Sequence, residues 1–403
     1  MDEKVRQKNN FSFGSGIVRG EKSSGMVGEL CDQALLDLGG DGEADIAFFF
    51  MTGHFCSEAQ KTQELLAKRL KARVLEGCTA ASIIVAGKEV EAEPAMSLFL
   101  AHLPGTNKFP FSIKQSDLEL MSDPEKCREY FGVKPEDSPT FFILPDPFSF
   151  DITSFLEKIQ KAYPGVPVIG GMASGAQEPG GNVLFWSEGI CEAGAVGVVL
   201  TGNIRISPLV SQGCRPFGEP AVITDAQENV ILSLAGRPAL EFLEDNYRQA
   251  SARDQVLARQ ALFIGALADE YKPKPGRGDF VIRNVIGLDR DTGALAISDY
   301  ARVGNTVQFH VRDADTADED LKHLCEDQKL KLASGPVQAA LIFSCNGRGS
   351  NMFRQRNHDV ATLETHLGKF PTAGFFCAGE LGPIGKKNFM HSFTASVALF
   401  YGQ

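Results

Sequence analysis

A glycine-flanked arginine after an apolar segment is the residue of this chain best suited to binding an anion. Residues 345–349 read CNGRG, so Arg348 lies between Gly347 and Gly349. Glycines let backbone N–H groups approach an anion closely, and a guanidinium forms two parallel hydrogen bonds to a carboxylate or phosphate. The pattern predicts a small anion site at the carboxyl end of a strand, where open α/β sheets bind ligands. The alternative is a surface arginine in an ordinary turn.

A carboxylate on a second glycine-rich turn could bind the other end of such a ligand. Residues 378–383 read AGELGP and place Glu380 between Gly379 and Gly382. A glutamate on a rigid turn is suited to a ligand amine, so Arg348 and Glu380 together could bind both ends of an amino acid. The alternative is a structural Glu380 that caps backbone amides or neutralises an arginine.

The predicted ligand-binding set also includes other residues of these turns, two residues of the strands that follow, and a second arginine. Its further members are Cys345, Asn346, Gly347, Gly349, Gly379, Gly382, His391, Thr394 and Arg215. Arg215 lies in GCRPFG, where an arginine that braces two domains through backbone carbonyls is the preferred alternative. For His391 the alternative is a buried structural histidine.

An alternative to ligand binding is that the protein is an enzyme with a catalytic cysteine. Cys345 and Cys377 lie at glycine-rich turns in a segment that also holds His358, His366 and His391, and imidazole can activate a thiolate. The chain lacks a GxSxG elbow, an HExxH helix, a Walker loop and a dinucleotide GxGxxG, and its nine cysteines include no CxxC pair. Binding is therefore favoured over catalysis, and no cofactor or metal is expected.

Composition restricts the class of protein and its partners. The chain has 403 residues, 43% of them hydrophobic, with a net charge of −11. These values are typical of a soluble globular protein, and the negative charge argues against binding nucleic acid. The sequence begins without an apolar signal segment, and no apolar run approaches the ~20 residues that span a membrane. We expect a cytoplasmic protein without a membrane partner.

One design occurs three times along the chain. An apolar strand, a polar loop, an amphipathic helix and a second strand lead in each copy to a glycine corner, at Gly77, Gly170 and Gly374. Further strands follow each corner. Such β-α-β-turn-β units predict an α/β fold with mixed sheets flanked by helices. We place the domains at residues 1–237 and 238–403 and expect them to pack tightly.

The chain resembles the FIST family (F-box and intracellular signal transduction proteins) through both its N-terminal and C-terminal domains. The motifs are GCTAASIIVAGKEVE, VIGGMASG, VSQGCRPFGEP, FVIRNVIGLDRDTGALAISD, VQFHVRDA, SCNGRG and GFFCAGELGP with HSFTA. The resemblance implies a sensory module for small ligands, with amino acids or related metabolites proposed, usually joined to a signalling output domain. Nothing after Gln403 could be an output domain, so we expect a signalling partner in trans. A protein-binding adaptor is the alternative.

Overall fold

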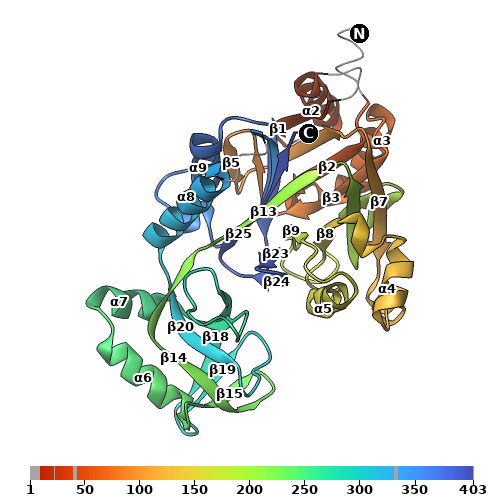
Figure 1. The fold of residues 1–403 in the computed structure, drawn as a ribbon. Coiled ribbons are helices and arrows are strands. Elements are labelled where there is room, and N and C mark those ends of the chain that lie inside the picture. The colour runs from red at the N-terminus through yellow and green to blue at the C-terminus, as the bar shows by residue number, and fades with distance from the viewer. Residues whose placement is uncertain (1–9, 22, 40–42, 331–334, 403) are drawn as a thin grey trace. The chain divides into compact units, whose positions relative to one another are not determined.

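The computed structural model describes residues 10–21, 23–39, 43–330 and 335–402, as a mixed α/β protein (Figure 1). This architecture confirms the predicted fold class. The chain forms two compact units: residues 1–210, 322–390 and 395–403 make the first, and residues 211–321 and 391–394 make the second. Among the described helices, none combines the length and apolarity that a membrane crossing requires.

Three six-stranded sheets form the first unit. The first sheet runs β1 (Ser12–Arg19), β6 (Ala95–His102), β2 (Ile46–Thr52), β3 (Val74–Ala80), β10 (Leu184–Trp186), β11 (Gly189–Cys191). The second runs β24 (Lys387–His391), β23 (Glu380–Ile384), β9 (Val168–Gly171), β8 (Thr140–Pro145), β12 (Ala195–Gly202), β7 (Thr106–Ile113). The third runs β13 (Arg205–Gln212), β25 (Thr394–Tyr401), β21 (Val337–Cys345), β22 (Thr372–Cys377), β4 (Ser82–Val85), β5 (Lys88–Glu91).

The three predicted copies share one pairing scheme and exchange hairpins. In each copy the first apolar strand pairs in parallel with the second and antiparallel with the last: β2 with β3 and β6, β8 with β9 and β12, β21 with β22 and β25. The second strand then pairs with a hairpin strand from another copy, as β3 does with β10, β9 with β23 and β22 with β4. The copies therefore interlock, and none has a complete sheet of its own.

Apolar side chains from all three copies meet in one buried core. Phe48, Phe142 and Phe343 belong to the same cluster, and the rings of Phe48 and Phe142 lie 5.6 Å apart. Strands buried on both faces read as continuous apolar runs, which explains the sequence of β2, IAFFFMT. The hydrophobic effect thus stabilises the three copies as one body.

The three repeated glycines do not form the turns that the sequence predicted. Gly77, Gly170 and Gly374 lie inside β3, β9 and β22, not in turns. A Cβ at these positions would lie 2.0, 1.9 and 1.8 Å from the carbonyl oxygens of Phe49, Ile143 and Ile342. Each of these oxygens belongs to the residue opposite the glycine on the parallel strand. The glycines are needed for close backbone approach within the sheet.

Helices cover the outer faces of the sheets. Helices α2 (Ser23–Leu38) and α3 (Ala59–Arg69) pack on the first sheet, and α4 (Pro124–Phe131) and α5 (Ile152–Ala162) pack on the second. Helix α9 (His358–Leu367) lies against β5, and α8 (Ala314–Leu330) precedes β21 in the chain.

The second unit is built on a seven-stranded sheet. Its order is β14 (Cys214–Gln227), β20 (Thr306–Arg312), β17 (Leu262–Leu267), β18 (Phe280–Asp289), β19 (Ala294–Ile297), β15 (Val230–Leu234), β16 (Arg237–Pro238). Helices α6 (Ala239–Gln249) and α7 (Ala252–Gln260) pack against it through apolar side chains. The domain division expected near residue 237 falls inside this unit.

Substituting a strand glycine tests whether the fold needs the close approach of the two parallel backbones. Gly374→Ala should lower the free energy of unfolding by about 1–3 kcal/mol or more, because the added Cβ forces the strands apart. Gly28→Ala is the matched control, since nothing lies within 4 Å of a Cβ there in α2. It should raise stability by up to about 1 kcal/mol through helix propensity. Urea unfolding measures both, and an unchanged Gly374→Ala would contradict the geometry.

Candidate functional site

The turn that follows β21 brings the two predicted cysteine turns together. Cys345 ends β21 and lies directly opposite Cys377 of β22. The Asn346 N–H donates to the Cys377 carbonyl oxygen at 3.0 Å, and the Gly347 N–H donates to Cys345 Sγ at 3.4 Å. The segment then enters a short 3-10 helix at Gly349–Asn351. The predicted turn therefore lies at the carboxyl edge of the third sheet.

Arg348 is fully buried in this turn and bound to a carboxylate of the protein itself. Its Nε donates to Asp359 Oδ2 at 2.8 Å and its Nη2 to Oδ1 at 2.7 Å. The guanidinium also lies over the Phe353 ring, 5.2 Å from its centroid. The fork that was predicted for a ligand anion holds Asp359, so the geometry favours a bracing role for the arginine. The alternative of a surface arginine is wrong, because Arg348 has no exposed side-chain area. A ligand role for Arg348 stays a prediction.

Asp359 lies at the centre of a buried hydrogen-bonded group. It also accepts from Ser344 Oγ at 2.8 Å, and His358 Nδ1 lies 3.0 Å from its Oδ1. Burial acts to raise the pKa of Asp359, but the charge of Arg348 and the hydrogen bonds outweigh it, and the net pKa falls well below the usual range. The arginine and the aspartate therefore stay ionised together.

The turn that contains Glu380 connects the second and third copies. Glu380 is fully buried in β23 and pairs with Gly171 of β9. The Gly379 carbonyl accepts from the Met172 N–H at 2.9 Å. A Cβ at Gly382 would lie 2.5 Å from Val210 Cγ2. Packing between strands thus accounts for the glycines, and a ligand role for this turn stays a prediction.

The remaining predicted residues belong to the second unit. His391 ends β24, Thr394 begins β25, and both side chains are buried. Arg215 Nε donates to Asp313 Oδ2 at 2.6 Å, and its Nη2 pairs with Asp254. Arg215 thereby connects β14 with α7 and the residue before α8 inside the second unit. It does so through carboxylates and not through the backbone carbonyls that the bracing alternative expected.

Glu89 is a buried carboxyl at the amino end of α9. Its Oε1 accepts from the N–H groups of Asp359 at 2.9 Å and Val360 at 3.2 Å. Its Oε2 has no hydrogen-bond partner among the described residues. Burial, together with the negative charges of Asp359 and Glu91, raises the pKa of Glu89 to about 7 against the pull of the two N–H groups.

Arg348→Lys separates the two roles of the arginine without any ligand. The lysine keeps the charge but loses the fork, so the free energy of unfolding should fall by about 1.5–3 kcal/mol. Arg354→Lys, at an exposed position of the same loop, should leave stability unchanged. Thermal and urea unfolding measure both. Equal stability of Arg348→Lys and the unaltered chain would rule out the bracing role.

The raised pKa of Glu89 predicts a pH dependence of stability. The folded state retains a proton that the unfolded chain loses above its ordinary pKa of 4.5, so stability should fall as pH rises from 4.5 to about 7. Glu89→Gln cannot ionise and should lose the Glu89 part of this slope, whereas exposed Glu192→Gln should keep the whole slope. Burial also raises the pKa of Glu76, so a smaller slope should remain in Glu89→Gln. Urea unfolding at pH 5 and pH 8 compares the three proteins. A slope in Glu89→Gln as steep as that of the unaltered chain would contradict the assignment.

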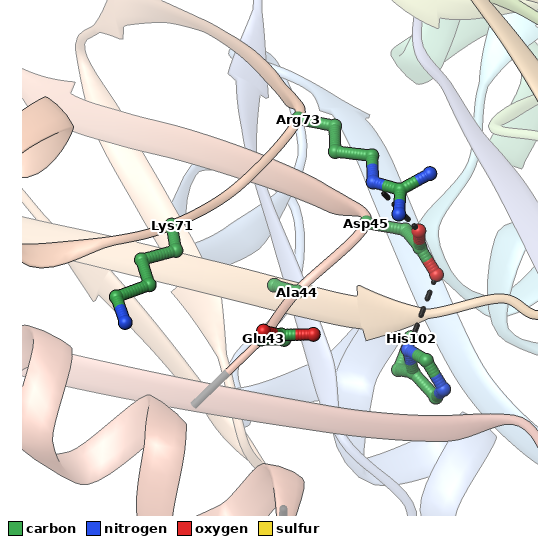
Figure 2. A pocket seen from close by; sticks show the side chains of 6 residues that line it. All are labelled: Glu43, Ala44, Asp45, Lys71, Arg73 and His102. Atoms are coloured by element: carbon green, nitrogen blue, oxygen red, sulfur yellow. Dashed lines mark ion pairs between the residues drawn. The ribbon is translucent and has the colours of Figure 1, made fainter. Parts of the chain in front are cut away.

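An open polar pocket lies at the opposite ends of the parallel strands, where β2 and β3 begin (Figure 2). Its volume is about 170 Å³, and it is lined by Glu43, Ala44, Asp45, Lys71, Arg73 and His102. The first three precede β2, the lysine and arginine precede β3, and the histidine ends β6. We call this the polar pocket.

Asp45 is the buried carboxylate among the residues that line the polar pocket. It is almost fully buried and accepts from the Leu103 N–H at 2.7 Å, while Lys108 Nζ lies 3.2 Å from its Oδ1. Figure 2 shows Arg73 and His102 both directed at this carboxylate. Burial acts to raise the pKa of Asp45, but the Leu103 hydrogen bond and the positive charges of Lys108 and His102 lower it on balance. Asp45 is therefore ionised and already compensated.

Arg73 differs from Arg348 in keeping its donors available. Its Nε lies 3.9 Å from Asp45 Oδ1, which is an ion pair but longer than a hydrogen bond, and its side chain is 80% exposed. Lys71 also lines the pocket and is exposed, with its side chain directed away from Arg73 (Figure 2). The polar pocket therefore presents two cations to solvent, next to the carboxylates of Glu43 and Asp45. Such a site can bind a carboxylate and an ammonium group of one small molecule.

Sequence reasoning missed the polar pocket because no motif contains it. Asp45, Arg73 and His102 come from three distant segments, each at the end of a strand. Only the order β6, β2, β3 brings them together. Charged residues at those three strand ends are the one signal that the sequence offers.

Two family models match the chain in succession: the FIST N domain matches residues 45–237 and the FIST C domain matches residues 239–383. An uncharacterized protein of Mycobacterium tuberculosis is 40% identical over 327 residues, which cover 81% of this chain and 83% of that protein. An uncharacterized protein of Mycobacterium bovis is 40% identical over 326 residues, covering 81% and 82%. A crystal structure of a cyanuric acid hydrolase from A. caulinodans covers 96% of this chain and 99% of its own, with 10% identity and a TM-score of 0.35.

Proposed function

Because the chain belongs to the FIST family, whose domains are associated with sensing in signal transduction, we propose that it is a sensory protein for a small anionic or zwitterionic metabolite. The ligand class is an amino acid or a related carboxylate. The signal passes to a separate output protein. The observation that carries this proposal is the polar pocket with its exposed Arg73, whose ion pair with Asp45 is longer than a hydrogen bond.

The charges of the polar pocket suit a zwitterion. Arg73 would bind the ligand carboxylate, and Glu43 would bind its ammonium group. A volume of about 170 Å³ is smaller than the roughly 300–1,000 Å³ of sites for drug-sized ligands. The pocket therefore suits one small metabolite.

The turn at residues 345–349 is the alternative ligand site. There a ligand anion would have to displace Asp359 from Arg348 in a fully buried position, and the buried Asp359 carboxylate would then lack the charge of Arg348. At Arg73 no such exchange is needed. This difference in cost favours the polar pocket.

A thermal-shift screen of amino acids and small carboxylates tests the proposal. A ligand at 100 times its Kd should stabilise the folded chain by about 2.7 kcal/mol. Arg73→Met should weaken binding by about 1.5–3 kcal/mol through the lost charge-assisted hydrogen bonds. The fold should tolerate this change, since the Arg73 side chain is 80% exposed. Arg290→Met, at an exposed arginine of the second unit, is the control and should bind as the unaltered chain does.

Two results would count against this assignment. If no compound of a broad library raises the melting temperature, the sensory proposal loses its basis. If a ligand binds Arg73→Met as tightly as the unaltered chain, the polar pocket is not its site. Loss of binding in Arg348→Lys alone, with the variant still folded, would place the ligand at the turn after β21.

A further inference from the structure

A second pocket, of about 100 Å³, shares one lining residue with the polar pocket, because Arg73 lines both. Its other lining residues come from α3, the segment before β3, β3 itself and the turn after β10. They are Gln63, Leu66, Ala67, Leu70, Ala72, Leu75 and Ser187. Most are aliphatic, and none of the described residues that line the pocket is acidic. This pocket suits a short uncharged chain of atoms.

Gln63 gives the second pocket one specific polar feature. Its side chain is almost fully buried, and its Nε2 donates to the Trp186 carbonyl oxygen at 2.9 Å. That bond fixes which end of the amide is nitrogen, because a carbonyl oxygen only accepts. The other end, Oε1, is buried without a hydrogen-bond partner in the described part of the chain. A buried acceptor without a hydrogen bond costs free energy, so a ligand that donates a hydrogen bond to this oxygen would gain affinity.

We infer that one ligand spans both pockets, with a carboxylate at Arg73 and an amide N–H that donates to Gln63 Oε1. The inference rests on the proposed function and narrows its ligand class to carboxylates with a short aliphatic chain that ends in a primary amide. Leu66, Leu70 and Leu75 flank the chain of methylenes. L-glutamine has this chemistry.

The charges around the second pocket distinguish an amide from an ammonium tail. Arg73 is the single charged residue among its described lining residues, and it is a cation. An ammonium group would be repelled there and would lose its hydration without a carboxylate to pair with. A carboxylate tail, as in L-glutamate, offers no N–H to Gln63. The neutral amide is the tail that meets both constraints.

A ligand series on the unaltered chain tests the inference by calorimetry. L-glutamine should bind at least about tenfold more tightly than L-methionine, which has a tail of similar length and no donor. L-glutamate and L-lysine should also bind more weakly than L-glutamine. Equal affinity of glutamine and methionine, or tightest binding of lysine, would overturn the inference while leaving the polar pocket as a ligand site. If none of the four binds, the proposed function for this ligand class fails as well.

Variants then assign the preference to Gln63. Gln63→Met should remove the preference for glutamine over methionine, because it removes the acceptor. Gln60→Met, an exposed glutamine of the same helix, should keep that preference. Arg73→Met should weaken all four ligands. A preference that survives in folded Gln63→Met would overturn the inference, and the series on the unaltered chain decides the matter if that variant fails to fold.

Discussion

The free edge of the second parallel strand in each copy is the constraint on which the rest of the structure depends. A strand edge presents N–H and C=O groups that must find partners when they are buried. Strands β3, β9 and β22 find them in hairpins that belong to other copies. Because the exchange runs through all three copies, each sheet is completed only when the others have formed. The glycines inside these strands permit the close spacing that the pairing needs.

Three ion pairs in the described part of the chain compensate charges that are buried or partly buried, and this restricts where a ligand can bind. Arg348 is bound to Asp359, Arg215 to Asp313, and Asp45 to Lys108. Such pairs fix strands and helices, but each cation already has its anion. Arg73 is different, because its contact with Asp45 is long and its side chain faces solvent. A ligand can use the charge of Arg73 without breaking the fold, and this is why the polar pocket carries the proposed function.

Much of the fold could be predicted from the sequence, because its signals are local. The apolar runs of β2, β8 and β21 and the evenly placed glycines predicted three copies of a β-α-β unit, and the pairing confirms them. The predicted role of the glycines as turn corners was wrong. They are needed because a carbonyl oxygen of the neighbouring strand lies close to each of them, and the spacing of glycines in the sequence does not reveal such a tertiary contact. The hairpin exchange is invisible for the same reason, because each hairpin looks like a local partner of the strand before it.

The candidate site was harder to predict, because electrostatic partners come from distant segments. The sequence correctly placed Arg348 in a turn after a strand, but it could not show that Asp359 of α9 turns inward to bind it. Glycine flanks are typical of both ligand loops and packed turns, so the motif alone did not separate them. Arg73 had no motif, and its importance depends on the neighbouring strand ends and on its own exposure.

A crystal structure of the chain grown with L-glutamine tests the central claim most directly, since that claim concerns the place of the ligand. The account predicts a bound molecule with its carboxylate at Arg73 and its side chain directed toward Gln63, while Arg348 keeps its two hydrogen bonds to Asp359. A ligand bound at Arg348 with Asp359 displaced, or clear density elsewhere and none at Arg73, would contradict it.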